Sequence, residues 1–314
     1  MLTLKGHKHP IQSVAFAPDG TALLTVDGGS GIRVWDLPSG KLRWEASEYY
    51  FSSAAFTPDS KFVITADRAG NRPVDLGARK RLPFEMQYPV RLHDSVTGVV
   101  APGPFQYPTG EGLYELTFTP DGTRCVARPG FDTKDLVWWE YPSGSPLPPW
   151  KNVVGHDYWK FRAMAIAPDG RTLAGVNTEG LSIFDMPDGE LRLRHAFKVV
   201  QGEARFAYHP DGRQIVFASG TRGAMFDLEK RSEIVEIKQA KKHFLALAFT
   251  MDGRHLATVS NEETVKFWDP STGQLATEYA WEVGGLRCLA FAPDGTTAAT
   301  GGTGKKIVVW DLDA

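Results

Sequence analysis

The chain has 314 residues, of which 42% are hydrophobic, and its formal net charge is −2. This composition supports a large buried core and excludes a disordered chain, and the near-neutral charge argues against a nucleic-acid binder, which needs a basic surface. No apolar run approaches the roughly 18 residues of a membrane span, and the chain does not open on a basic-then-apolar leader. We therefore expect a cytoplasmic protein that binds neither nucleic acid nor membrane.

The first predicted element is a strand at residues 2–5. Leu2 and Leu4 alternate with polar neighbours, and Gly6-His7 then breaks the run. No earlier segment of the sequence is there to pair with this strand, so its partner must lie further along the chain.

A tight turn follows the next strand and recurs through the chain. "FAPDG" stands at residues 16–20 and 291–295, and between them lie "FTPDS", "FTPDG", "IAPDG", "YHPDG" and "FTMDG". Five of the six gaps between their aspartates are 40–48 residues, and one is 62. Proline pre-sets the first turn position, aspartate bonds the local backbone and glycine accepts a positive φ, so each copy predicts a hairpin. The regular spacing indicates seven structural repeats.

A second pattern follows each turn by 16–19 residues, as in "IRVWDLPSGK" and "IVVWDL". A bulky residue ends an apolar strand, and an acidic residue begins the next turn. The seven pairs are Trp35-Asp36, Val74-Asp75, Trp139-Glu140, Phe184-Asp185, Phe226-Asp227, Trp268-Asp269 and Trp310-Asp311. We interpret each pair as the end of the third strand of its repeat.

In these two motifs and their period, the chain resembles the WD40 repeat family over essentially its whole length. The resemblance implies an all-β fold: one seven-bladed β-propeller over residues 1–314, with four-stranded antiparallel blades around a central channel. In the first repeat we expect strands at residues 11–17, 22–26, 32–36 and 41–45. The last repeat supplies only three strands, so residues 2–5 should complete the last blade and close the ring, which leaves no unpaired inner edge.

The cysteines and the histidines are interpreted within this frame. Cys125 should lie in the second strand of blade three and Cys288 in the inner strand of blade seven, too far apart for a disulfide. Many WD40 blades contain a buried hydrogen-bonded chain of His, Ser or Thr, Trp and Asp. The usual aspartate position, six residues before the tryptophan, holds Gly29, Glu262 and Gly304 in the three clearest repeats. We expect this network to be mostly missing, unless a shifted loop brings in Asp27, and we expect His7 and His156 to be structural.

The long gap marks an insertion of about twenty residues. We assign it to residues 87–112, after the outer strand of blade two. Long loops inside compact domains are often functional. The alternative is a packed loop that covers a blade edge, since the segment carries Val99, Val100, Phe105 and Tyr107 among its prolines and glycines.

No catalytic or cofactor motif is found. The sequence has no GxxxxGK[ST] phosphate loop, no HExxH, no CxxC pair and no GxSxG elbow. We therefore predict no catalytic residues, no cofactor and no metal.

The candidate site is a rim of aromatic and basic residues on one face. Large aromatic rings concentrate in the connections on the face that the family calls the top, and such rings, with arginine, anchor protein interfaces. Repeat register places cations at the same channel mouth, which in the family is the usual peptide-binding site. The predicted top rim consists of Tyr50, Tyr114, Tyr158, Trp159, Lys160, Arg162, His243, Trp281 and Arg287. This set suits an acidic or aromatic peptide; the alternative is that the rings only pack against the loops.

We predict a monomeric, non-catalytic scaffold that binds a protein or peptide partner, an acidic one, on its top face. The alternative is a propeller enzyme or small-ligand binder that uses the central channel. For that alternative the converging charged residues would be Arg162, Glu203 and Arg287.

Overall fold

The computed structural model describes residues 1–29, 31–47, 51–67, 74–75, 80–81, 90–101, 105, 113–129, 136–150, 161, 163–177, 179–186, 188–197, 199, 204–238 and 242–312. These residues form strands and no helix. Accordingly, the described part of the chain holds no helix that is long and apolar enough to cross a membrane.

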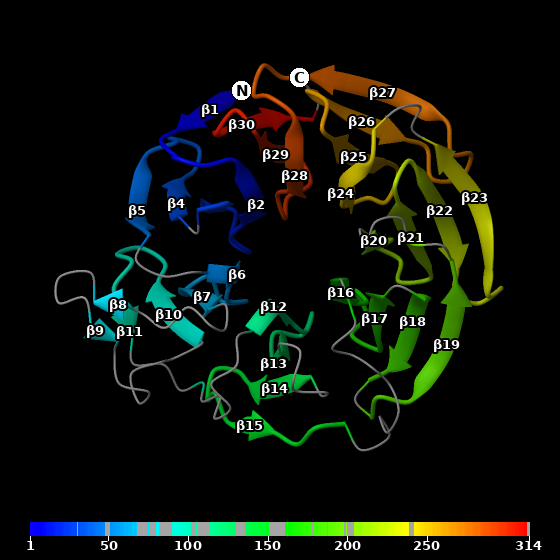
Figure 1. The fold of residues 1–314 in the computed structure, drawn as a ribbon, viewed down its shortest axis with the longest axis horizontal. Coiled ribbons are helices and arrows are strands. Elements are labelled where there is room, and N and C mark those ends of the chain that lie inside the picture. Colours follow the sequence, from blue (N-terminus) through cyan, green and yellow to red (C-terminus); the bar gives the residue numbers. More distant parts are fainter. Residues whose placement is uncertain are drawn as a thin grey trace.

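Seven four-stranded antiparallel sheets, counted over the described residues, stand as blades around a central channel (Figure 1). Blades are numbered along the chain, and their strands are given from the inside outward. Blade 1 has β2 (Ile11–Phe16), β3 (Ala22–Asp27), β4 (Ile32–Asp36) and β5 (Leu42–Ala46). Blade 2 has β6 (Phe51–Phe56), β7 (Phe62–Asp67), β10 (Val90–Asp94) and β11 (Val100–Ala101). Blade 3 has β12 (Leu113–Phe118), β13 (Arg124–Pro129), β14 (Val137–Glu140) and β15 (Pro146–Leu147).

The remaining four blades repeat the same order. Blade 4 has β16 (Ala163–Ile166), β17 (Thr172–Asn177), β18 (Gly180–Asp185) and β19 (Leu191–Ala196). Blade 5 has β20 (Arg205–Tyr208), β21 (Gln214–Ser219), β22 (Arg222–Asp227) and β23 (Ser232–Lys238). Blade 6 has β24 (Phe244–Phe249), β25 (Leu256–Ser260), β26 (Thr264–Trp268) and β27 (Leu275–Ala280). Blade 7 has β28 (Leu286–Phe291), β29 (Thr297–Gly302), β30 (Lys306–Asp311) and β1 (Leu2–Lys5).

The predicted closure of the ring is confirmed. β1 pairs antiparallel with β30, with Leu2 opposite Val309 and Leu4 opposite Ile307, and the two chain ends lie close together in Figure 1. Leu4 is 2% exposed and packs into a cluster with Ile11, Trp35 and other side chains from blades 7 and 1. The first strand therefore both completes blade 7 and helps to seal it against blade 1.

The seven predicted turns are present and share one geometry. In each of them the aspartate Oδ1 accepts the backbone N–H of the residue two positions later, at 2.8–3.2 Å. Six of the turns end on a glycine with φ of 70–73°. In blade 2 Ser60 takes this left-handed conformation instead, at φ 59°, and its hydroxyl accepts the N–H of Asp19 at 3.1 Å.

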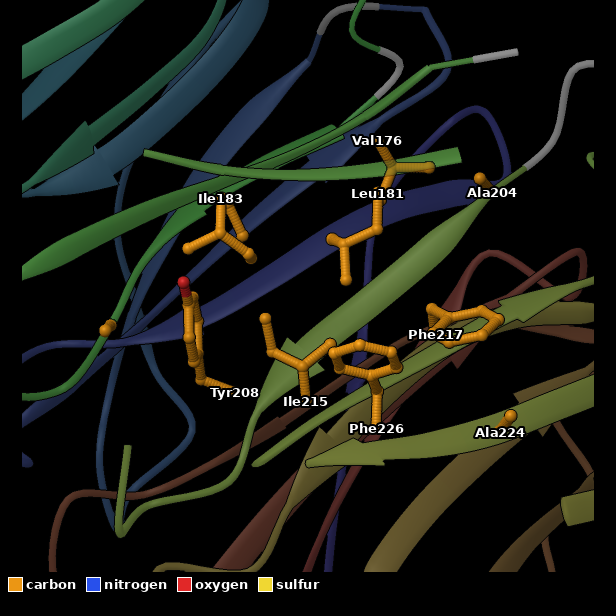
Figure 2. Close-up of a cluster of buried hydrophobic side chains, with 11 residues drawn as sticks. Val176, Leu181, Ile183, Ala204, Tyr208, Ile215, Phe217, Ala224 and Phe226 are labelled. Carbon is orange, nitrogen blue, oxygen red and sulfur yellow. The ribbon is translucent and has the colours of Figure 1, made fainter. Parts of the chain in front are cut away.

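Large apolar side chains fill the space between neighbouring blades. Between blades 4 and 5, Ile183 and Leu181 from β18 face Ile215 and Phe226 from β21 and β22 (Figure 2). Phe226 and Ile215 are fully buried. The Tyr208 hydroxyl, the polar side-chain group of this cluster, forms a 3.1 Å hydrogen bond with Thr172 of the adjacent blade.

The assignment of blade 2 from sequence is wrong in one respect. The third strand is β10, which pairs with β7 and ends at His93-Asp94, whereas Val74-Asp75 forms the short strand β8, paired with β9 (Lys80–Arg81). The extra residues therefore lie between β7 and β10, at positions 68–89, and not after the outer strand. Of the proposed 87–112 segment, Phe105 is 2% exposed and packs edge-on against Trp139, whereas Tyr107 lies outside the described residues.

The cysteine assignments are confirmed. Cys125 lies in β13 and Cys288 in β28, and both thiols are buried and free. Burial raises the pKa of the Cys288 thiol to about 12, so this group is inert as a nucleophile at neutral pH.

The buried polar network exists in full in blade 1, where a shifted loop brings in Asp27, as the stated exception expects. His7 bonds Asp27 Oδ2 at 3.0 Å through Nδ1 and Thr25 Oγ1 at 2.7 Å through Nε2. Trp35 Nε1 donates to the same Thr25 hydroxyl at 2.8 Å. Asp27 occupies the acidic place because its second oxygen accepts the N–H groups of Gly29 and Gly31, both at 2.9 Å, which folds the loop around it. His7 is thus structural, as predicted; His156 lies outside the described residues.

Candidate functional site

A cavity of about 790 Å³ opens in the central channel, lined by residues from blades 1, 5, 6 and 7. We call it the channel cavity. The starts of the inner strands β2, β20, β24 and β28 form its wall, and residues 242–243 and Asn261 add to it from the adjoining loops. Its volume falls within the range of roughly 300–1,000 Å³ that is usual for ligand sites.

Basic side chains dominate the polar part of this lining. Arg205, Lys242, His243 and Arg287 contribute to it, together with the amides of Gln12 and Asn261, and no carboxylate is among the described lining residues. Arginine and lysine are charged at neutral pH. The described wall of the channel cavity is therefore cationic and attracts anions.

The two arginines of this lining differ in the hydrogen bonds that their guanidinium groups make. Arg205 donates through Nε to the Leu245 carbonyl at 2.8 Å and through Nη1 to the Ala204 carbonyl at 2.9 Å, so backbone dipoles rather than a carboxylate orient its guanidinium. Arg287 is half-buried, and its Nε is buried without an acceptor among the described residues. A buried donor without a partner is costly, and an anionic ligand would supply the missing acceptor.

The structure brings together part of the predicted top rim. His243 and Arg287 line the channel cavity. Trp281 is half-buried outside that lining, where it packs on Trp310 at 5.2 Å and stacks on Tyr279, as the packing alternative expects. Tyr114 lies in β12. The other predicted residues lie outside the described part of the chain: Tyr50, Tyr158, Trp159, Lys160 and Arg162.

Sequence reasoning missed Arg205, Lys242 and Asn261. Arg287 stands seven residues before the aspartate of its turn, whereas Arg205 stands six residues before the aspartate of its own turn, one position further along the repeat. Extending the same register by one position would have found Arg205. Lys242 and Asn261 lie in connections outside the strands, where register gives no guide to side-chain placement.

Glu115 occupies the same repeat position as Arg205, on the inner strand of blade 3. Its Oε1 accepts the Met164 N–H of blade 4 at 3.2 Å, and its Oε2 lies 3.6 Å from Arg128 Nε. Ser53, at this position in blade 2, likewise accepts the Leu116 N–H at 3.2 Å. This repeat position therefore links one inner strand to the next.

The protein around Glu115 changes its acidity, although water reaches 28% of the side chain. Desolvation raises the pKa of the Glu115 carboxyl to about 7, against the opposing effects of the Met164 N–H and of Arg128. The folded state then binds a proton that the unfolded chain releases near pH 4.3. Stability is therefore lost as pH rises from about 4.3 to about 7.

Glu115→Gln is expected to remove this pH dependence, because the neutral amide still accepts the Met164 N–H and carries no charge. The variant should gain stability relative to wild type as pH rises: the difference between their free energies of unfolding, variant minus wild type, should be about 2 kcal/mol larger at pH 8 than at pH 5. Urea denaturation at both pH values measures this difference. Glu179→Gln, at an exposed glutamate, is the matched control and should track wild type; an equal pH slope for wild type and Glu115→Gln would contradict the assignment.

The described residues contain no group of three or more His, Cys, Asp or Glu side chains placed to hold a metal ion. The basic lining of the channel cavity supports electrostatic and hydrogen-bonding recognition of an anion.

Comparison with known proteins agrees with the repeat pattern. The family model "WD domain, G-beta repeat" matches residues 1–36, 235–269 and 275–311. Over 98% of its length the chain is 24% identical to telomerase protein component 1 of Mus musculus, of which it spans 13%. It is 25% identical over 67% of its length to WD repeat and SOCS box-containing protein 1 of Danio rerio, spanning 52% of that protein. It is also 24% identical over 81% of its length to the periodic tryptophan protein 2 homolog of Neurospora crassa, spanning 30% of it.

Proposed function

The chain is a WD40-repeat β-propeller, and we propose that it is a non-catalytic scaffold that binds a carboxylate-rich segment of a partner protein at the top mouth of its channel. The cationic lining of the channel cavity is the observation that carries this proposal. Propellers of this family usually bind proteins, and one of the relatives named above, WD repeat and SOCS box-containing protein 1, carries the WD repeat in its name.

The geometry of the cavity suits carboxylates in particular. A guanidinium holds a carboxylate with two parallel hydrogen bonds, and Arg287 has a buried Nε without an acceptor among the described residues. Lys242 and His243 stand at the start of the adjoining inner strand. A segment with two or three acidic residues would meet each of these groups, and an aromatic residue in it would contact the apolar wall of Leu245 and Leu289.

Charge reversal tests the proposal. The probe is a fluorescein-labelled peptide of sequence EYEDFE, and binding is read by fluorescence anisotropy at about 0.15 M salt. The double variant Lys242→Glu/Arg287→Glu should weaken binding at least about tenfold, with an unchanged melting temperature. Arg213→Glu/Lys230→Glu, a matched double reversal at exposed turns on the opposite face, should leave binding within about twofold of wild type. Equal affinity of wild type and the double variant would refute the site.

A small polyanion that fills the cavity is a second candidate, favoured by the cavity's volume of about 790 Å³. Calorimetric titration with citrate separates the two. Citrate that binds more tightly than the peptide and competes with it would favour the small ligand; weak or absent citrate binding would favour the peptide.

A further inference from the structure

A second cavity opens on the opposite face of the propeller from the channel cavity, at the junction of blades 7 and 1. It measures about 730 Å³. Whereas the channel cavity is lined by the starts of β2 and β28, this groove is lined by the turns that follow their ends, at residues 18–21 and 292–294. We call it the seam groove.

The floor of the seam groove is apolar. Leu2 of β1, Phe16 of β2 and Leu37 of the turn after β4 line it, and all three are only partly buried against the cluster that seals blade 7 to blade 1. Val309 and Trp310 of β30 add to the same wall. Apolar side chains left partly accessible in a concave site are the usual basis of a docking surface.

Three carboxylates, Asp19, Asp294 and Asp311, are the acidic residues of the seam groove. Asp19 and Asp294 belong to the repeated turns, where the turn uses only Oδ1. No hydrogen bond reaches Oδ2 of either residue from the described part of the chain. One oxygen of each carboxylate is therefore available to a ligand.

In most of the other repeats the turn aspartate lies beside a cation; blade 3, where Thr123 follows Asp121, is like the seam in this respect, but its aspartate does not line the groove. The same turn aspartate has a cation beside it in four blades: Lys61 at 3.6 Å from Asp59, Arg171 at 3.9 Å from Asp169, Arg254 at 3.5 Å from Asp252, and His209 at 2.9 Å from Asp211. In blades 7 and 1 the corresponding position two residues after the aspartate holds Thr296 and Thr21. Within the described residues, Asp19, Asp294 and Asp311 have no ion-pair partner.

From this combination we propose that the seam groove docks a basic and apolar segment of a partner protein, with lysine or arginine side chains on the three aspartates and large apolar side chains on the floor. The occupant follows from charge complementarity: the described charged side chains of the groove are acidic and unpaired, and the surface between them is apolar. The proposal is independent of the channel cavity. Together the two sites would let the propeller hold an acidic segment on one face and a basic segment on the other.

The probe for the seam groove is a fluorescein-labelled peptide of sequence RLKFRL, measured by fluorescence anisotropy at about 0.15 M salt. Two comparison peptides test each part of the recognition: ELEFEL reverses the charges, and RSKSRS removes the apolar side chains. Wild type should bind RLKFRL at least about tenfold more tightly than either. Absence of RLKFRL binding, or equal binding of RSKSRS, would overturn the proposal.

Thr296→Arg is the diagnostic variant, because it restores in blade 7 the cation found at the same turn position in blades 4 and 6. It should weaken RLKFRL binding about fivefold. Thr123→Arg is the matched control: it makes the same change at the same turn position in blade 3, next to Asp121, which does not line the groove. Its affinity should stay within about twofold of wild type, and an equal loss in the two variants would show that the peptide binds by general charge alone.

A second variant guards against loss of folding. Asp311→Asn removes one groove carboxylate at an exposed position and should also weaken RLKFRL binding while the melting temperature stays unchanged. Sedimentation at rising protein concentration completes the test. A dimer that forms in wild type, dissociates in Thr296→Arg and competes with RLKFRL would identify a second copy of this chain as the occupant and overturn the assignment to a basic partner.

Discussion

Removal of residues 1–5 is expected to lower the free energy of unfolding by about 4–6 kcal/mol. The deletion takes away β1, which pairs with β30 through four residues. It also removes Leu4, which is 2% exposed, from the cluster between blades 7 and 1, and full burial of one leucine contributes about 2–3 kcal/mol. Because whole domains are stable by only about 5–15 kcal/mol, this single short strand supplies a large share of the total.

Urea denaturation followed by tryptophan fluorescence measures the effect. Leu4→Ser separates the side chain from the strand pairing and should lose only part of the stability that the deletion loses. A synthetic peptide of residues 1–8, added to the deletion variant, should restore much of the loss. A deletion variant that unfolds at the wild-type urea midpoint would show that β1 does not close the ring in solution.

Thr25→Val is expected to cost about 3–4 kcal/mol, although the two side chains have nearly the same shape. The Thr25 hydroxyl is the centre of the blade 1 network, since it bonds both His7 and Trp35. Valine leaves both of these buried ring nitrogens without a partner, and each unsatisfied buried group costs about 1–3 kcal/mol.

Blade 6 provides the matched control for this prediction. There Trp268 Nε1 donates to Thr258 at 2.8 Å, and position 240, the counterpart of His7, holds an alanine. Thr258→Val leaves one donor unpaired and should cost about 1–2 kcal/mol. Chemical denaturation of both variants gives the comparison, and equal losses would contradict a special role for the His7 network.

The same network makes the stability of the fold depend on pH. Burial lowers the pKa of His7, opposed by its hydrogen bond to Asp27, so folding favours the neutral imidazole. The stability that this group contributes is present above about pH 6.5 and is lost as pH falls through the lowered pKa. Burial acts to raise the pKa of Asp27, but the hydrogen bonds from Gly31, His7 and Gly29 outweigh it and lower this pKa, so this contribution too is lost in acid. Glu115 acts in the opposite direction, because its stabilising contribution is lost as pH rises towards about 7.

Repeat regularity made most of the fold predictable. The Pro-Asp-Gly turns recur because each must reverse the chain within a few residues, so their spacing located the seven blades and the closing strand. The third strand of blade 2 was assigned wrongly, because an apolar residue followed by an acidic one is a weak signal when tryptophan is absent. The turn sequence after His93-Asp94, "SVTG", resembles the "LPSG" that follows Trp35-Asp36 and was the better evidence.

The candidate site was predictable only at strand positions that correspond from one repeat to the next. Arg287 and His243 were placed because equivalent strand positions lie at equivalent places in a ring. The seam groove was not predicted, because it depends on two turns that neighbour each other only after the ring has closed. Its signal in the sequence is an absence: Thr21 and Thr296 stand where blades 4, 5 and 6 carry Arg171, Arg213 and Arg254.

The pairing of β1 with β30 also sets an order of events during synthesis. Leu4 is synthesised 303 residues before its partner Ile307. Until β30 has been made, the first strand has no edge to pair with, and closing so long a loop is slow. Blade 7 and the seam groove are therefore the last parts of the propeller to form, and the acidic docking surface is displayed only after β30 has been synthesised.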